Sequence, residues 1–145
     1  MIYLDTSALI KLYIRETGSE DVQAWVVSQD DPLPVWDLQE MELTNALNLK
    51  VFWGDFSRAD AERQIDLFRE RRRRGFYVYP DFDRLDWVER YFEICGHTRE
   101  IGTRTLDVQH VACALLIKPA AFISYDERQR KLAAKLDLNV LPREV

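Results

Sequence analysis

Four acidic residues occupy positions where a carboxylate could take part in chemistry. Asp5 ends a short apolar segment, residues 2–5, and Asp126 lies two residues beyond another, residues 121–124; both segments are predicted strands. The carboxyl ends of parallel strands meet at one edge of an open sheet, where such sheets bind ligands. If the two strands are neighbours, the two acids share a crevice. The alternative is that each residue caps the helix that begins after it.

Glu42 lies within a predicted helix over residues 37–53, on a side where a carboxylate needs a partner. At 100° per residue it shares a mostly apolar stripe with Leu38, Met41, Asn45, Leu49 and Phe52. We therefore expect Glu42 on the buried face and its neighbour Glu40 on the outer one. An unpaired buried charge is costly, so Glu42 is expected either to bind a metal ion or to pair with an arginine such as Arg104.

Asp107 stands in the first turn of a predicted helix over residues 105–118 that is apolar nearly all round. Such a helix is buried, so this acid must find a partner inside the protein or at a cleft. The alternative is electrostatic, because the helix dipole favours an anion at this position by about 0.3–1 kcal/mol.

Carboxylates that converge on one pocket would suit a hard divalent cation. Like charges close together raise one another's pKa and cannot all stay ionised without a cation. Oxygen ligands favour Mg²⁺ or Mn²⁺ over zinc, and no His or Cys stands at metal-binding spacing in the sequence. Such a metal lowers the pKa of a bound water and polarises a phosphoryl oxygen. The set therefore predicts phosphodiester hydrolysis.

The composition is that of one folded domain over residues 1–145. Of the 145 residues, 47% are hydrophobic and 31% charged, and five Gly and five Pro do not cluster, which excludes collagen-like, low-complexity and disordered classes. The longest apolar run, residues 111–117, is far shorter than the roughly 20 residues of a membrane-spanning helix. The N-terminus carries no signal-peptide pattern. We expect a cytoplasmic protein without a membrane span, in which Cys95 and Cys113 are packed thiols.

Short apolar segments alternate with longer helical periods, the pattern of βαβ units. The sequence predicts the α/β class, with a single domain and a parallel sheet of four or five strands flanked by helices. Strands are expected at residues 2–5, 33–36, 76–79, 121–124 and 140–141. Helices are expected from near Ser7, at about 19–28, at 37–53 after Asp37 as N-cap, at 57–74 opened by Ser57, around 85–92, at 105–118 and at 127–136, with a polar link at 96–104.

The basic residues are unevenly distributed. A net charge of −5 argues against general attraction to nucleic acid, but five arginines fall within positions 69–74. The candidates for contact with RNA phosphates are Arg71, Arg72, Arg73 and Arg74. The alternative is a solvated helix C-terminus whose positive charge complements the helix dipole.

Two other residues have both a functional and a packing interpretation. His110 follows Asp107 by three positions and could transfer protons, although a histidine in an apolar helix is more often a hydrogen-bonded packing residue. Trp36, at the end of a predicted strand, could stack an unpaired base. Packing in the core or at an interface is the favoured interpretation of Trp36.

Four segments match a known family in order and register: Tyr-Leu-Asp5-Thr-Ser-Ala-Leu, Glu42-Leu-Thr-Asn-Ala-Leu, Arg104-Thr-Leu-Asp107-Val-Gln-His-Val-Ala-Cys-Ala and Phe-Ile-Ser-Tyr-Asp126. With these segments the chain resembles a PIN domain, and in particular the VapC-like toxins of type II toxin–antitoxin systems. The resemblance covers nearly the whole chain. Four motifs in register are far more specific than any one of them.

This resemblance implies a metal-dependent endoribonuclease. The family's acidic quartet, which holds Mg²⁺ or Mn²⁺, corresponds to Asp5, Glu42, Asp107 and Asp126. Asp5 and Asp107 match the principal metal ligands, and Glu42 completes the site or acts through water. Whether Asp126 contacts the metal stays open.

The resemblance also implies a mechanism and partners. A metal-bound water attacks the scissile phosphorus, and the metal stabilises the developing charge. Thr6 and Ser124 match hydroxyl positions that orient the acids, although Ser124 stands where Thr is more usual. The implied partners are an RNA substrate, a second copy of the chain in a homodimer, and a cognate antitoxin whose C-terminal segment wraps the toxin and can place a basic side chain in the acidic site.

Three other functions stay open on the sequence. A flavodoxin-like receiver domain also gathers acids at strand ends and binds Mg²⁺, but Glu42 comes from a helix interior and no second acid stands beside Asp5. A phosphatase with an aspartyl nucleophile would carry Asp where Ser7 stands. The last alternative is a catalytically inactive PIN scaffold that binds proteins, for which all four carboxylates would not be needed.

Overall fold

The computed structural model describes residues 1–144 and has the predicted α/β class. Three strands, β1 (Tyr3–Leu4), β4 (Phe122–Ile123) and β5 (Val140–Leu141), form a parallel sheet in the order β1-β4-β5. β2 (Leu33–Pro34) and β3 (Tyr77–Val78) pair in parallel as a second sheet. The five expected strands are all present and parallel, and their hydrogen bonds divide them into sheets of three and two strands.

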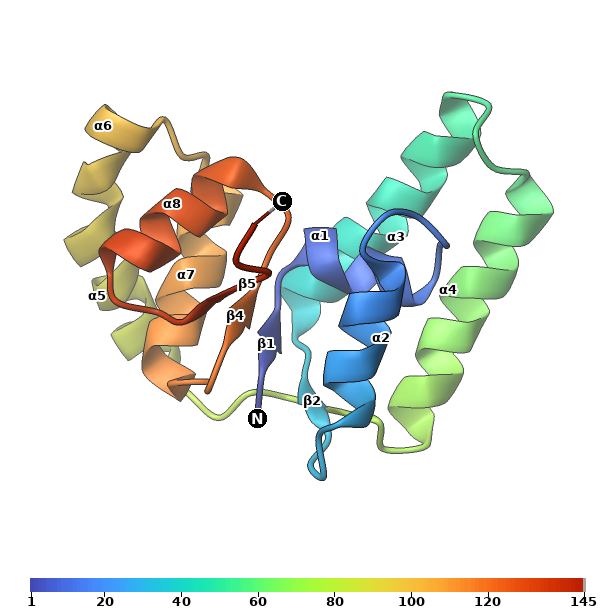
Figure 1. Cartoon of the computed structure of the whole chain (residues 1–145), viewed down its shortest axis with the longest axis horizontal. Coiled ribbons are helices and arrows are strands. Elements are labelled where there is room, and N and C mark those ends of the chain that lie inside the picture. Colours follow the sequence, from blue (N-terminus) through green and yellow to red (C-terminus); the bar gives the residue numbers. More distant parts are fainter. Residues whose placement is uncertain (145) are drawn as a thin grey trace.

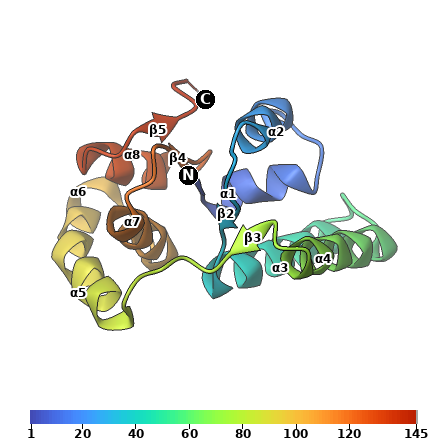
Figure 2. The same ribbon diagram turned by 90° about the horizontal axis from the view of Figure 1, so that it is seen from below.

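Helices lie on both sides of the β1-β4-β5 sheet, as Figure 1 and Figure 2 show from two directions. The N-terminal half supplies one side with α1 (Thr6–Leu9), the 3-10 helix η1 (Ile10–Leu12), α2 (Ser19–Val27), α3 (Asp37–Phe52) and α4 (Arg58–Arg73). The C-terminal half supplies the other with α5 (Arg84–Ile94), η2 (Cys95–His97), α6 (Thr98–Ile101), α7 (Thr105–Ile117) and α8 (Glu127–Lys135). The expected polar link at 96–104 thus forms two short helices. No helix among the described residues is long and apolar enough to cross a bilayer.

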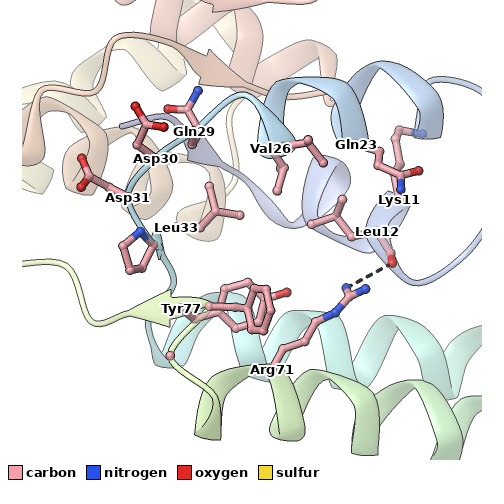
Figure 3. Close-up of a pocket in the computed structure, with 14 residues that line it drawn as sticks. Lys11, Leu12, Gln23, Val26, Gln29, Asp30, Asp31, Leu33, Arg71 and Tyr77 are labelled. Carbon is pink, nitrogen blue, oxygen red and sulfur yellow. Dashed lines mark hydrogen bonds between the residues drawn. The ribbon is translucent and has the colours of Figure 1, made fainter.

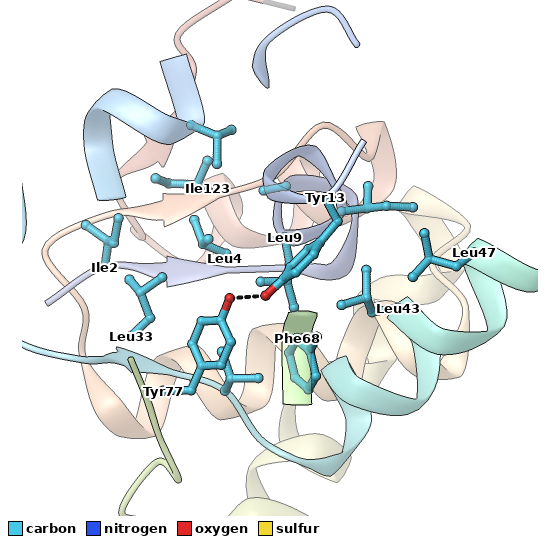
Figure 4. Close-up of a cluster of buried hydrophobic side chains, with 14 of the residues drawn as sticks. Ile2, Leu4, Leu9, Tyr13, Leu33, Leu43, Leu47, Phe68, Tyr77 and Ile123 are labelled. Atoms are coloured by element: carbon cyan, nitrogen blue, oxygen red, sulfur yellow. Dashed lines mark hydrogen bonds between the residues drawn. The ribbon is translucent and has the colours of Figure 1, made fainter. Parts of the chain in front are cut away.

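The strands divide their side chains between two hydrophobic cores. Tyr3 and Phe122 belong to one core, with residues of α7 and α8, and Leu4 and Ile123 belong to the other, with residues of α3 and α4. Successive residues of a strand point to opposite faces, so a sheet with two-residue strands still separates the two cores. Figure 4 shows the core on the α3 side. Any contact between residues of the two cores is therefore made across this sheet or past its edges.

Capping interactions set where several helices begin. Ser57 accepts a backbone N–H of the first turn of α4, as predicted, and Asp126 caps α8. At α3 the N-cap is Trp36, and the prediction of Asp37 was wrong by one residue. The reason is the Gln39 side chain, because its Oε1 accepts the Trp36 backbone N–H at 3.0 Å.

Helix α3 buries a different face from the one that its apolar stripe predicted. Its buried residues are Gln39, Leu43 and Leu47, which recur every four residues, and the two leucines pack into the core of Figure 4. Met41 and Phe52 of the predicted stripe are 67% and 82% exposed. Because α3 carries apolar residues on both faces, periodicity could not choose between them, and packing against α1 and α4 decides the face.

The two faces of α3 allow a direct test of this packing. Leu47→Ala removes a fully buried side chain and is expected to lower the free energy of unfolding by about 2–5 kcal/mol. Phe52→Ala, the matched control on the exposed face, should change it by about 0.5 kcal/mol or less. Urea denaturation measures both values. A larger loss for Phe52→Ala than for Leu47→Ala would contradict the observed face.

Candidate active site

Asp5 lies at the carboxyl end of β1 and is completely buried. Its Oδ1 accepts hydrogen bonds from Ser7 Oγ at 2.6 Å and from the backbone N–H of Ala8 at 2.9 Å. Its Oδ2 accepts a hydrogen bond from Ser124 Oγ at 2.6 Å. Ser124 follows β4, the neighbour of β1, so the predicted meeting of the two strand ends is found in the structure.

Burial controls the ionisation of Asp5. The loss of hydration raises the pKa of this carboxyl group, because it disfavours the charged form. His110 and the hydrogen bonds from Ser124, Ser7 and Ala8 act in the opposite direction and offset only part of the effect. Asp5 is therefore a carboxylate that the fold keeps in the interior at an energetic cost.

Asp126 performs the helix-capping role that was the alternative at sequence level. Its Oδ1 accepts the backbone N–H groups of Arg128 and Gln129, both at 2.9 Å, at the start of α8. Its own backbone N–H donates to Ser124 Oγ at 3.1 Å. Ser124 thus bridges Asp5 and Asp126, and one oxygen of Asp126 is fixed by the helix that it caps.

Asp107 is buried at the start of α7 and has a partner that sequence reasoning missed. Its Oδ2 accepts the backbone N–H of Arg104 at 2.7 Å, and its Oδ1 accepts Gln129 Nε2 at 3.2 Å. Gln129 is buried, and its Oε1 has no hydrogen-bond partner within residues 1–144. A sequence signal existed, because Gln129 stands at helical spacing before Leu132 and Ala133, the other buried residues of α8.

Glu42 is held by two residues of other elements. Thr6 Oγ1 donates to Glu42 Oε2 at 2.8 Å, and His110 Nε2 contacts the same oxygen. The alternative of a pairing with an arginine such as Arg104 is therefore wrong. The Glu42 side chain is 21% exposed, so it lies at the border of the buried face and not within it. Glu40, expected to face outward, is half-buried and forms an ion pair with Arg72 at 2.9 Å.

The pKa of Glu42 is shifted in the opposite direction from that of Asp5. Partial burial by itself raises the pKa of Glu42, but the hydrogen bond and the electrostatic effect of His110, together with the hydrogen bond from Thr6, outweigh this effect. The net result is a lowered pKa, so Glu42 is the more readily ionised of the two acids.

Shared neighbours join three of the four acids. Ser124 Oγ bonds to the Asp5 carboxylate and to the backbone N–H of Asp126, and Gln129 bonds to Asp107 through its side chain and to Asp126 through its backbone N–H. His110 and Thr6 both contact Glu42. Hydrogen bonds thus join residues that are far apart in the chain, while the convergence of all four acids on one pocket stays a prediction.

The donor set suits a hard cation in type but is not assembled as a metal site. Within residues 1–144, no three His, Cys, Asp or Glu side chains lie close enough together to hold a metal ion. Both oxygens of Asp5 and both oxygens of Asp107 already accept hydrogen bonds. Carboxylate oxygens are the ligands that Mg²⁺ and Mn²⁺ prefer. The chemical type of these side chains therefore suits such a cation, but the distances between them do not.

The arginine run makes contacts within its own chain. Arg71 donates to the Leu12 carbonyl at 3.5 Å, Arg72 pairs with Glu40, and Arg73 pairs with Glu70 at 2.7 Å. Arg74 is exposed and lies over the ring of Phe76. In Figure 1 the C-terminal end of α4 lies at the same end of the molecule as the N-terminus, whereas Asp5 follows the other end of β1.

A cavity of about 520 Å³ lies apart from the acids, between α2 and the β2-β3 pair (Figure 3). Its lining includes Leu12, Val26, Leu33, Tyr77 and Arg71. None of the four acids lines it. The cavity and the acidic site are thus separate features of the molecule.

Three comparisons place the chain among known proteins. Residues 2–135 match the sequence model of the PIN domain. Ribonuclease VapC47 of Mycobacterium tuberculosis (strain CDC 1551 / Oshkosh) is 28% identical over 130 residues, which cover 88% of this chain and 86% of that protein. Ribonuclease VapC46 of Mycobacterium tuberculosis (strain ATCC 25618 / H37Rv) is 27% identical over 142 residues, which cover 97% and 95%. The crystal structure of FitAcB from Neisseria gonorrhoeae has the same fold, with a TM-score of 0.62 at 19% identity over 98% of this chain and 97% of that chain.

Replacement of the buried carboxylate tests its energetic cost. Asp5→Asn is expected to stabilise the protein at neutral pH, because the amide avoids the buried charge and its Nδ2 can donate to Ser124 Oγ. A gain of about 1 kcal/mol corresponds to a rise in Tm of about 2–4 °C in a domain of this size. The pKa of Asp5 is raised in the folded state, so lowering the pH through it protonates the wild-type group, and the gain should shrink.

Thermal unfolding in EDTA at a series of pH values measures this difference without any contribution from metal. Asp66→Asn, at an exposed residue of α4, is the control and should show no comparable gain. A loss of Tm in Asp5→Asn at neutral pH, or a gain that grows toward acid pH, would show that the Asp5 carboxylate stabilises the fold.

Proposed function

Because the chain belongs to the PIN domain family, we propose that it is a divalent-metal-dependent endoribonuclease, the toxin of a toxin–antitoxin pair, which hydrolyses RNA phosphodiester bonds. The observation that carries this proposal is the link of Asp5 and Asp126 through Ser124 at the carboxyl ends of β1 and β4, with Glu42 bonded to Thr6, the residue after Asp5. The two relatives named as ribonucleases, which align over most of the chain, support the choice of RNA as substrate.

The proposed catalytic residues are Asp5, Glu42, Asp107 and Asp126, and the proposed cofactor is Mg²⁺ or Mn²⁺. When bound, such an ion supplies polarisation of a phosphoryl oxygen and a water of lowered pKa. Asp5 and Asp107 are the proposed principal ligands, and Glu42 is the more exposed acid that completes the set. The capping contacts of Asp126 favour an indirect role for this residue.

The hydroxyl groups of the site hold the acids in position. Ser124 Oγ directs Oδ2 of Asp5, and Thr6 Oγ1 fixes Oε2 of Glu42 and leaves the other oxygen of that carboxylate free of Thr6. These contacts keep two carboxylates ionisable at the same sheet edge, which is the role proposed for both hydroxyls.

Protein partners are part of the proposal. A cognate antitoxin and a homodimer are proposed as for VapC-like toxins, and an acidic site offers a binding place for a basic side chain of the antitoxin. The exposed apolar side chains of Met41, Phe52 and Trp53 on and after α3 are available for such contacts.

Cleavage of RNA with Mg²⁺ or Mn²⁺ tests the proposed function. Asp5→Asn and Asp107→Asn are each expected to lower kcat/KM by about 100- to 1000-fold, the loss that follows removal of one group that stabilises charge in a transition state. EDTA should abolish cleavage, and Asp66→Asn, on the exposed face of α4, should leave it unchanged. Cleavage that persists in EDTA and in Asp5→Asn would exclude the metal–carboxylate mechanism. Absence of cleavage of any RNA would favour the inactive scaffold.

The arginine run gives a separate prediction for RNA binding. Replacement of Arg73 and Arg74, the more exposed members, by Gln should weaken binding and reduce the slope of log K against log salt by about 1 for each RNA phosphate that the variant no longer neutralises. Replacement of Arg58 and Arg63, at the other end of α4, by Gln is the matched control of equal charge. Filter binding between low and high salt measures the slope. Equal slopes for the two double variants would assign the run to the solvated end of the helix.

A further inference from the structure

His110 connects Glu42 of the acidic site with Tyr3 in the core on the α7 side of the sheet. It comes from α7 and is completely buried. Its Nε2 contacts Glu42 Oε2, and its Nδ1 lies 2.8 Å from the Tyr3 hydroxyl. Both ring nitrogens are therefore engaged, and neither is free to exchange a proton with a substrate. This arrangement argues against general acid or base catalysis by His110.

The partners of Tyr3 determine which nitrogen of His110 carries the proton. The Tyr3 hydroxyl accepts a hydrogen bond from Trp36 Nε1 at 3.1 Å, and an indole nitrogen can only donate. The hydroxyl proton of Tyr3 is thus free to be donated to His110 Nδ1. When the ring is neutral and Tyr3 donates to Nδ1, the ring proton is on Nε2, from which it is donated to the carboxylate of Glu42. Hydrogen bonds are then donated in turn by Trp36 to Tyr3, by Tyr3 to His110 and by His110 to Glu42.

The start of this chain of hydrogen bonds is rigid. Trp36 is buried, and its ring packs edge to face against Phe82 and Trp87, each with 5.2 Å between ring centroids. Tyr3 stacks on Phe122 of the neighbouring strand at 5.6 Å. The orientation of His110 is therefore set by aromatic packing on the α7 side of the sheet, while Glu42 belongs to α3 on the other side.

We propose that His110 is a positioning residue that fixes the Glu42 carboxylate in the active site through a tautomer set by Tyr3 and Trp36. This inference rests on the proposed function, because the position of Glu42 matters only if Glu42 serves the reaction. His110 and Thr6 both bind Oε2, so Oε1 is the oxygen that these two contacts leave available to a cation or an ordered water. The position of Glu42 thereby depends on the packing of the core that contains Tyr3 and Phe122.

Two substitutions of His110 separate positioning from packing. His110→Gln and His110→Asn both bury one amide, but only the Gln amide reaches the place of Nε2 and can donate to Glu42, whereas Asn reaches only the place of Nδ1. His110→Asn is expected to lower kcat by about 10- to 100-fold, as for partners that orient catalytic ligands, with little change in KM. His110→Gln should retain more of the activity. If kcat falls in both variants in proportion to their loss of Tm, the proposal is overturned.

Tyrosine variants provide the matched control. Tyr3→Phe and Tyr77→Phe each remove one buried, hydrogen-bonded hydroxyl, but Tyr77 bonds to Tyr13 on the α4 side and not to the site. Only Tyr3→Phe should lower kcat and alter the ¹⁵N signals of the His110 ring. In a Glu42→Gln background, His110→Asn should have no further effect on kcat, since His110 acts through Glu42. Additive losses would contradict this coupling.

The ¹⁵N spectrum of the His110 ring keeps the two proposals apart. We expect a protonated Nε2 and an unprotonated Nδ1 in the wild-type protein, and a change in the Nε2 signal in Glu42→Gln. A proton on Nδ1 would overturn the role of His110 even if RNA is cleaved. Absence of RNA cleavage by the wild-type protein would reject the proposed function, and the spectrum would still decide whether His110 holds Glu42.

Discussion

A carboxylate held out of water is the constraint on which this structure depends. Asp5 has no exposed surface, and the lost hydration that raises its pKa is offset only in part by its hydrogen bonds. Two donors, Ser7 and Ala8, are local to the chain turn after β1, but Ser124 reaches Asp5 only because β4 lies beside β1. The pairing of two strands that are distant in sequence therefore both forms the sheet and brings Ser124 within hydrogen-bonding distance of Asp5.

The polar residues around Asp5 lie where two hydrophobic cores meet at the end of a sheet. Buried polar groups must be hydrogen-bonded, and here the partners come from different elements: Gln129 from α8 bonds Asp107 from α7, and His110 from α7 bonds Glu42 from α3. The contact of His110 with Glu42 makes the site sensitive to how helices from opposite sides of the sheet pack. A protein that needs buried carboxylates for chemistry gives up stability that an apolar replacement would supply.

The distribution of charge in the molecule separates the acids from the arginines. Arg72 bridges α4 to Glu40 of α3, and Arg73 pairs within α4, so these side chains stabilise the helix pair as well as carrying positive charge. Arg71 contacts the Leu12 carbonyl beside a cavity that none of the four acids lines. None of these three guanidinium groups bonds to the four acids, whereas Arg130 of α8 donates to the Ser124 carbonyl at 2.7 Å beside them.

The sequence by itself determined the class of fold, the parallel strands, the positions of most helices and the family, because short apolar runs, caps and motif spacing are local properties of the chain. It did not determine which face of α3 is buried, since both faces carry apolar residues such as Leu47 and Phe52, and only packing against α1 and α4 chose between them. The partners of the acids also came from the tertiary structure. Glu42 meets His110 and not Arg104, and Asp107 meets Gln129, because hydrogen bonds between distant elements depend on distances that no residue spacing encodes.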